Sequence, residues 1–133
     1  MSEIKKLNLS TNKILAQISN KVGHIIFNNP ERHNAVSLEM WDAVEEALIA
    51  FSKDENIRVV ILSGAGGKSF VSGADISKFD SERGSKEAVD HYNARIKVVY
   101  NLIENFAKPT ISMINGYCIG GGLNLACCTD LRI

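Results

Sequence analysis

The stretch IRVVILSG, residues 57–64, constrains the fold more than any other part of the chain. Its near-continuous run of apolar, β-branched residues predicts a strand that is buried on both faces, as in a parallel sheet. Parallel neighbours need a long crossover connection, which is usually a helix. The segment before the strand predicts one, because its apolar residues recur at helical spacing. These residues are Met40, Trp41, Val44, Ala47, Leu48 and Phe51.

The segment that precedes this helix has the pattern of a hairpin. Residues 14–19 and 24–29 are apolar and β-branched, and Asn20 and Gly23 between them suit a tight turn. After a loop with Pro30, Ser37 is expected to cap the first turn of the helix. The opening elements therefore predict a β-to-α-to-β unit.

Strand and helix patterns also alternate in the rest of the chain. Residues 65–80 read as a glycine-punctuated loop, and a second amphipathic helix follows and ends by Pro109. The apolar stripe of that helix consists of Val89, Tyr92, Ile96, Val99, Leu102, Ile103 and Phe106. Residues 110–119 return to strand composition, a short helix begins at LNLACC, and the chain ends in a partial strand. The predicted fold class is α/β, in one domain or part of one.

Composition narrows the possible partners. The chain has 133 residues, of which 15 are basic and 15 acidic, so its net charge is zero. An evenly mixed charge argues against a nucleic-acid surface or a membrane-adsorbing face as the main function. The N-terminus lacks the apolar core of a signal peptide, and no segment is long enough to span a bilayer. We expect a cytoplasmic protein that acts on a small molecule, with no nucleic-acid or membrane partner.

Three cysteines lie close together near the end of the chain, at Cys118, Cys127 and Cys128. Their odd number favours reduced thiols, and no spacing of metal-ligand residues predicts a metal site. GYCIG, residues 116–120, fits a nucleophile elbow with Cys118 as the nucleophile. Such a thiol needs a histidine base that follows it in the chain, and every histidine precedes it. The histidines are His24, His33 and His91. A cysteine hydrolase therefore remains only as an alternative.

Two glycine-bearing turns, SGAD and IGGGLN, each lead into a short helix. The first backbone N–H groups of a helix have no partner inside the helix and attract negative charge. If the two turns converge, these groups make an oxyanion hole. The alternative is that the glycines only permit tight turns and close packing.

Four segments together resemble the enoyl-CoA hydratase/isomerase, or crotonase, superfamily. They read NNPERHNAVS, KSFVSGADISKF, KPTISMINGYCIGGGLNLA and CTDLRI, in this order. The resemblance implies a crotonase-like spiral of β-β-α units, truncated before its C-terminal helices. Residues 1–133 would be the N-terminal part of a single domain, and the whole protein a homotrimer or hexamer.

The same resemblance implies an acyl-CoA thioester as the substrate, with coenzyme A as part of it and no separate cofactor. The backbone N–H groups of Ala74 and Gly121 would hold the thioester carbonyl and stabilise an enolate. Arg32, in the loop after the hairpin, is the expected phosphate contact. The expected substrate-binding residues are Arg32, Ala74, Asp75, Ile76, Ser77, Gly121 and Gly122.

One position departs from the pattern of the hydratases. Their catalytic glutamate in GGGxE is Asn124 here, and an amide cannot act as a general base near neutral pH. Their second glutamate would lie beyond residue 133, and we expect Asp75 and Asp130 to serve a helix cap and a turn. Hydration or isomerisation of enoyl-CoA is the default reaction. Decarboxylation, thioester hydrolysis and a non-catalytic acyl-CoA-binding role remain alternatives, and the 133-residue chain alone is expected to be inactive.

Overall fold

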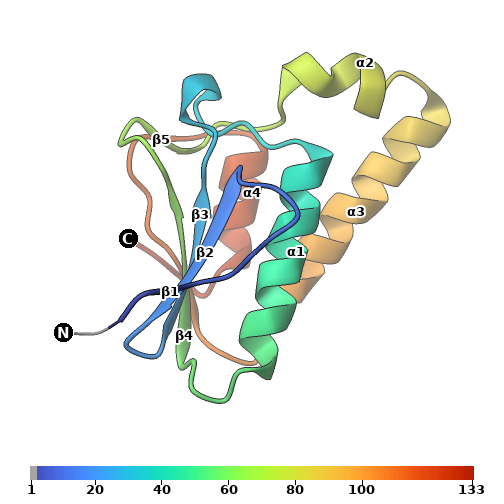
Figure 1. Ribbon diagram of the computed structural model, residues 1–133. Helices are drawn as coiled ribbons and strands as arrows, with labels where there is room; N and C mark the ends of the chain where they lie inside the picture. Colours follow the sequence, from blue (N-terminus) through green and yellow to red (C-terminus); the bar gives the residue numbers. More distant parts are fainter. Residues whose placement is uncertain (1–2) are drawn as a thin grey trace.

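A six-stranded mixed sheet with helices packed on one face forms the body of the protein (Figure 1). The computed structural model describes residues 3–133. The strands of this sheet lie in the order β1-β2-β3-β4-β6-β8, and β5 and β7 pair separately. Their bounds are β1 Lys5–Lys6, β2 Ile14–Ser19, β3 Val22–Phe27, β4 Val59–Gly64, β5 Ser69–Val71, β6 Thr110–Ser112, β7 Tyr117–Cys118 and β8 Leu131–Arg132.

Strands β2 and β3 form the predicted hairpin, with Ile14 opposite Phe27 and Ser19 opposite Val22. Its turn differs from the expectation in one residue. Asn20 and Lys21 are the turn residues and both have positive φ, at 51° and 67°. Gly23 lies in β3 instead, where a Cβ atom would come within 2.8 Å of the Phe51 ring. This glycine therefore serves packing between strand and helix, not the turn.

Helix α1, Leu38–Lys53, follows the hairpin and buries the predicted apolar stripe against the sheet. Its N-terminus is capped differently from the expectation. Ser37 occupies the N-cap position but makes no side-chain hydrogen bond to the helix. The Leu38 N–H donates instead to the Glu82 carboxylate, at 3.1 and 3.2 Å from its two oxygens. A carboxylate from a distant segment thus replaces the local cap.

Strand β4 lies parallel to β3, and β6 and β8 extend the parallel part of the sheet. The strand predicted at residues 57–64 is confirmed over Val59–Gly64, but the expected burial on both faces is wrong, because half-buried Val59 and Ile61 alternate with buried Val60 and Leu62. The predicted loop at residues 65–80 was wrong in part. It contains strand β5, the 3-10 helix Ile76–Lys78 and the start of helix α2, Phe79–Glu82. Glycines on both sides of the short strand hid it from the sequence pattern.

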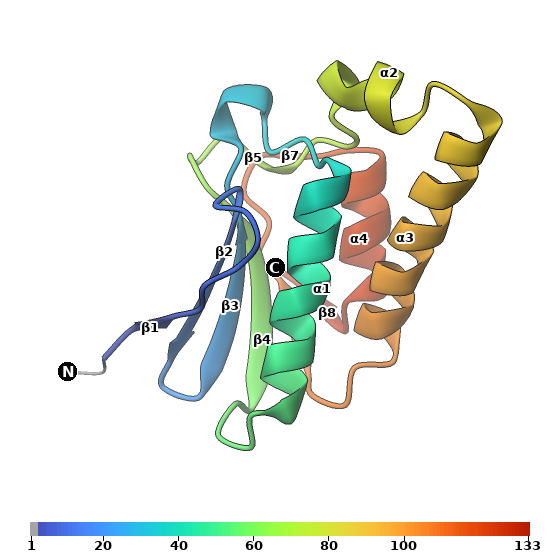
Figure 2. The same cartoon turned by 45° about the vertical axis from the view of Figure 1, so that its right-hand side comes forward.

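Helices α3, Lys86–Glu104, and α4, Gly121–Cys128, complete the helical layer beside α1 (Figure 2). Arg95 on α3 forms ion pairs with Asp42 and Glu45 on α1. The predicted single strand at residues 110–119 is two strands, β6 and β7, which belong to different sheets. Helix α4 already begins at Gly121, so the glycine run is part of the helix start.

The order of these elements is a threefold repeat of two strands and a helix. The units are β2-β3-α1, β4-β5-α3 and β6-β7-α4. In the second and third units, the first strand joins the large sheet and the second strand joins the small one. The chain therefore winds as a spiral of β-β-α units.

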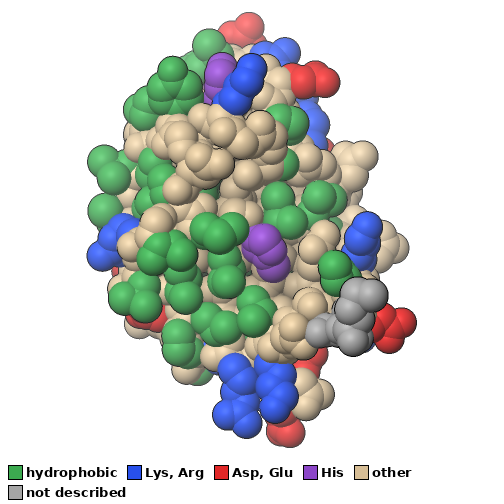
Figure 3. All heavy atoms as spheres, turned by 90° about the vertical axis from the view of Figure 1, so that its left-hand side faces the viewer, with side chains coloured by type: hydrophobic (Ala, Val, Ile, Leu, Met, Phe, Trp, Pro, Cys, Tyr) green, Lys and Arg blue, Asp and Glu red, His purple; other side chains and the backbone are tan. Residues whose placement is uncertain are grey.

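Within residues 3–133, the opposite face of the large sheet carries no helix (Figures 1 and 2). Apolar side chains gather on this face, with a histidine among them (Figure 3). At the edge of the sheet, Leu131 and Ile133 are 57% and 72% exposed. Within residues 3–133, no helix is both long and apolar enough to cross a membrane.

Candidate functional site

The first glycine-bearing turn pairs with the segment just before α1. Ala74 and Val36 form a short parallel bridge there. The Val36 N–H donates to Gly73 O at 2.9 Å, and the Asp75 N–H donates to Val36 O at 3.1 Å. In a parallel bridge of this pattern, the N–H of the central residue points away from its neighbour. The Ala74 N–H accordingly has no hydrogen-bond partner within the described residues 3–133. It is an open donor.

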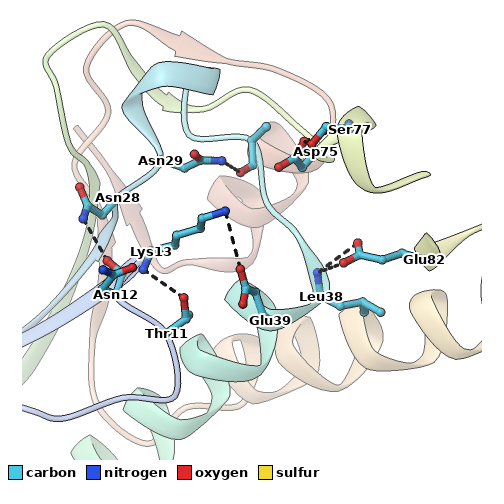
Figure 4. Close-up of polar contacts among 11 residues, drawn as sticks. Thr11, Asn12, Lys13, Asn28, Asn29, Leu38, Glu39, Asp75, Ser77 and Glu82 are labelled. Carbon is cyan, nitrogen blue, oxygen red and sulfur yellow. Dashed lines mark hydrogen bonds and ion pairs between the residues drawn. The ribbon is translucent and has the colours of Figure 1, made fainter. Parts of the chain in front are cut away.

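Asp75 fixes the next part of this turn. Its Oδ1 accepts the Ser77 N–H at 3.0 Å and the Ser77 hydroxyl at 2.6 Å, so it caps the 3-10 helix (Figure 4). The side chain is deeply buried, with 3% of the residue exposed. The capping role expected for Asp75 is confirmed. The turn role expected for Asp130 stays a prediction, because its carboxylate instead ties this bend to the start of β6, where it accepts the Thr110 N–H at 2.9 Å.

The second glycine-bearing turn is the start of α4. Gly120 has φ 55° and ψ −119°, a conformation open to glycine and costly for other residues. The Gly122 N–H donates to Ile119 O at 2.9 Å, and the Asn124 N–H donates to Gly120 O at 3.0 Å. The Gly121 N–H has no partner in the part of the chain that the structure describes. This turn thus also presents one open donor.

The two turns lie directly against each other. A Cβ atom placed on Gly73 would be 3.9 Å from Gly121 N, and one placed on Gly121 would be 3.8 Å from Gly73 Cα. Ala74 is the residue after Gly73, so both unpaired donors lie at one junction. Adjacent unpaired N–H groups, one of them at a helix N-terminus, attract an oxygen that carries negative charge.

The alternative reading of the glycines as packing residues holds for one of them. A Cβ atom on Gly122 would lie only 1.9 Å from Val71 O on β5. The Gly122 N–H is already bonded to Ile119, so Gly122 offers no open donor. The run GGG therefore combines a backbone bend at Gly120, an open N–H at Gly121 and a close approach at Gly122.

A cavity of about 350 Å³ opens beside Ala74. It brings together four of the predicted substrate-binding residues, Arg32, Ala74, Asp75 and Ile76. The other residues that line it are Glu31, His33, Ala35 and Ser72. The predicted residues Ser77, Gly121 and Gly122 do not line it.

Two buried asparagines hold the loop that carries Arg32. The Asn34 side chain donates to Ala65 O at 3.0 Å and to Ser69 O at 2.9 Å, and its Oδ1 accepts the Asn29 N–H at 2.8 Å. Asn29 donates in turn to Ala35 O at 2.9 Å. The exposed Arg32 is thus presented on a loop that is fixed at its base.

Asn124 lies on the first turn of α4, three residues after Gly121, and its side chain is exposed. Positions three apart share a helix face, so Asn124 lies beside the open N–H. Its amide brings hydrogen-bond donors and an acceptor to this position, and no titratable group.

Tyr100 on α3 also reaches this turn, which the sequence interpretation missed. Its hydroxyl donates to Gly121 O at 3.2 Å. Burial raises the pKa of Tyr100 to about 12, with smaller contributions from Cys128 and Tyr92. The hydroxyl therefore stays protonated and able to donate. The spacing of Ile96, Tyr100 and Ile103 is a signal that would have placed Tyr100 on the inner face of the helix.

Cys118 does not have the surroundings of an activated nucleophile. It is half-buried at the end of β7, and burial, with a smaller effect of Cys127, raises its pKa. A raised pKa disfavours the thiolate that a nucleophile needs. Within residues 3–133, the histidine hydrogen bond to a side chain joins His24 to Ser63, not to Cys118. The same residues contain no group of three or more metal-ligating side chains.

Comparisons with known proteins agree with this architecture. The family model described as Enoyl-CoA hydratase/isomerase matches residues 17–133. A crotonyl-CoA hydratase of Syntrophomonas wolfei is 35% identical over 120 residues, which are 90% of this chain and 45% of that protein. A mitochondrial Delta(3,5)-Delta(2,4)-dienoyl-CoA isomerase of Mus musculus is 34% identical over 118 residues, which are 82% of this chain and 36% of that protein.

Among solved structures, an enoyl-CoA hydratase/carnithine racemase from Magnetospirillum magneticum superposes with a TM-score of 0.87 at 39% identity. The superposition covers 93% of this chain and 46% of that one. The predicted crotonase fold is confirmed. The chain spans about half the length of this structure and less than half of the two relatives.

Proposed function

Because the chain belongs to the enoyl-CoA hydratase/isomerase family, we propose that its site binds the thioester group of an acyl-CoA. In this proposal the N–H groups of Ala74 and Gly121 form an oxyanion hole. The observation that supports it is the contact between two turns, each of which carries a backbone donor without a partner among the described residues. A thioester carbonyl oxygen would supply the acceptor that both groups lack.

The hole would act on the charge that develops during enolate chemistry. When a proton leaves or a nucleophile adds next to a thioester, negative charge moves to the carbonyl oxygen. One preorganised donor at that oxygen contributes about 2.7 to 4 kcal/mol to transition-state stabilisation. Backbone donors hold their positions before the reaction, so little reorganisation is required.

The coenzyme A part would extend into the cavity beside Ala74. Arg32 at this cavity is the proposed phosphate contact, since a guanidinium can bind phosphate through two parallel hydrogen bonds. Ile76 is 74% exposed there and offers an apolar contact. We propose no cofactor beyond the coenzyme A of the substrate.

Hydration or isomerisation of an enoyl-CoA is the reaction we propose for the whole protein, following the names of the two relatives. Asn124 limits what α4 can contribute to this reaction. Its amide can position a water molecule or a carbonyl but cannot take up a proton. The group that moves the proton must therefore be another residue or lie outside this chain.

The test is a hydration assay with crotonyl-CoA on the whole protein, comparing wild type, Asn124→Ala and Asn124→Glu. We expect wild-type turnover and a decrease in Asn124→Ala, because the water would lose its hydrogen bonds. A wild type that binds crotonyl-CoA without turnover, and becomes active as Asn124→Glu, would instead support the second candidate. That candidate, favoured by Asn124 itself, is a non-catalytic acyl-CoA-binding protein. Failure of wild type to bind crotonyl-CoA would contradict both.

We also propose that the whole protein assembles as a homotrimer or hexamer. The exposed apolar residues Met113, Leu131 and Ile133 support an assembly or a further packed layer, because isolated domains rarely leave such groups open together. Sedimentation equilibrium of the whole protein measures its mass, and a monomer would contradict the proposal.

A further inference from the structure

Tyr100 is the point where α3 contacts the first turn of α4. Its hydroxyl donates to Gly121 O at 3.2 Å, and a Cβ atom on Gly121 would be 3.7 Å from that hydroxyl. Gly121 is the residue whose N–H is open and whose N atom lies close to the turn of Ala74. Tyr100 therefore bonds the carbonyl of the same residue that presents the donor.

The glycine run is held by backbone hydrogen bonds and by few side-chain contacts. A Cβ atom on Gly120 would meet no atom within 4 Å, so this side of the residue faces open space. Glycine also has the largest backbone freedom of all residues. Gly122 is held by its close approach to β5, on the far side of Gly121. The Gly121 N–H shares a peptide plane with Gly120 O, which accepts the Asn124 N–H. The next plane, on the other side of the Gly121 Cα, is held by the Gly122 N–H bond to Ile119 O and by Tyr100 at Gly121 O.

Tyr100 itself is held in a rigid setting. Its ring packs edge-on against Trp41, with centroids 5.7 Å apart and planes at 89°. Trp41 is buried in α1 and packs edge-on against Phe27 of β3 at 6.3 Å. The chain of rings connects the hydroxyl to the large sheet. A fixed donor of this kind can fix a flexible backbone.

We propose that Tyr100 is a positioning residue that holds the Gly121 N–H in the direction of the thioester oxygen. The inference rests on the proposed function. Gly121 has no side chain that could restrict its backbone, and the hydroxyl of Tyr100 on α3 restricts it instead. Because Tyr100 acts through Gly121, it should affect the transition state more than the binding of the ground state.

The test compares Tyr100→Phe with Tyr92→Phe in the whole protein. Each variant removes one hydroxyl from α3, but Tyr92 makes no hydrogen bond to α4. With crotonyl-CoA we expect kcat of Tyr100→Phe to fall about ten- to a hundredfold, the effect of a misplaced catalytic group, with little change in KM. Tyr92→Phe should keep both constants. Equal losses in the two variants, matched by equal losses of Tm, would reduce Tyr100 to a structural role and overturn the inference.

A spectroscopic readout separates this inference from the proposed function. The infrared carbonyl band of 13C-labelled butyryl-CoA should shift to lower frequency on binding to wild type, and shift less on binding to Tyr100→Phe. An equal shift in both proteins would overturn the role of Tyr100 alone. No shift in wild type would overturn the oxyanion hole itself.

Fluorinated tyrosines at position 100 keep the test valid if Tyr100→Phe does not fold. They retain the ring and the hydroxyl while making the hydroxyl progressively more acidic, and hence a stronger donor. The carbonyl band of bound butyryl-CoA should change progressively along the series. A band that stays constant along the series would contradict a positioning hydrogen bond.

Discussion

The two turns that present the open donors are held in different ways. The Ala74 turn is tied to α1 by the bridge to Val36 and is closed by the buried carboxylate of Asp75. The Gly121 turn consists of glycines at the start of α4, and its fixed points are Gly122 against β5 and the hydroxyl of Tyr100. One donor is thus held mainly by backbone hydrogen bonds, and the other by a close packing contact and a side-chain hydroxyl.

This difference predicts where substitutions act. At the Ala74 turn, the side chain of Asp75 holds the backbone through hydrogen bonds, so its removal should lower stability by the loss of these bonds. At the Gly121 turn, the absence of side chains permits the geometry, so an added methyl group should act by steric clash at Gly122 and by backbone strain at Gly120. The predictions that follow test these two modes against each other.

The largest effect is expected for Gly122→Ala. The added methyl group would lie 1.9 Å from Val71 O, so α4 must move away from β5. We expect the free energy of unfolding to fall by about 3 kcal/mol or more, at the upper end of overpacking costs. Gly120→Ala is the matched control: its methyl group meets open space, so its loss comes only from the strained positive-φ backbone, about 1 to 3 kcal/mol. Urea denaturation of both variants measures the difference, and equal losses would contradict the packing role of Gly122.

A smaller effect is expected for Asp75→Ala in the other turn. The variant removes both hydrogen bonds to Ser77, and losing a helix cap costs about 1 to 2 kcal/mol in the free energy of unfolding. Asp75→Asn keeps an acceptor oxygen and should retain most of the stability. The measurement is again urea denaturation. If Asp75→Asn loses as much as Asp75→Ala, the carboxylate charge and not the cap is what matters.

The smallest effect concerns Glu82, whose carboxylate caps α1 from the segment that follows the Ala74 turn. Burial raises the pKa of Glu82, and the hydrogen bond from Leu38 and the charge of Lys78 oppose this only in part. The folded protein therefore binds a proton more readily than the unfolded chain between the ordinary pKa and the raised pKa. Stability should fall as pH rises through this window and then level off.

Glu82→Gln removes this dependence while its amide oxygen still accepts the Leu38 N–H. Because Glu82 is partly exposed, we expect only a small effect. Across this pH window, the unfolding free energy of wild type should change by about a few tenths of a kcal/mol more than that of the variant. Thermal unfolding of both proteins from pH 4 to pH 8 measures it. A slope that is unchanged in the variant would assign the pH dependence to another group.

Much of the fold could be predicted from the sequence, because the main elements have strong periodic patterns of apolar residues. The strand at residues 57–64 and the helix with Trp41 and Phe51 were predicted from apolar spacing alone. The short strands β5 and β7 were not resolved, since two or three residues between glycines leave no period to read. Local propensity also failed at Ser37, because the carboxylate of Glu82, 44 residues from Leu38, caps the helix instead.

The candidate site was predicted through the glycine turns and the family resemblance. Each turn alone allowed a packing explanation, and only their contact in space brings the two open donors together. Tyr100 and Glu82 were missed for the same physical reason. Their hydrogen bonds join residues 21 and 44 positions apart, and no local pattern encodes such a pairing.

The central claim is that Ala74 and Gly121 bind one carbonyl oxygen with their N–H groups. Amide proton chemical shifts of the whole protein, labelled with 15N-alanine and 15N-glycine, test it in a titration with butyryl-CoA. The account predicts that both amide protons move downfield together, and that S-butyl-CoA, the thioether that lacks the carbonyl, leaves them in place. Equal shifts with the two ligands, or no shift at either residue, would contradict it.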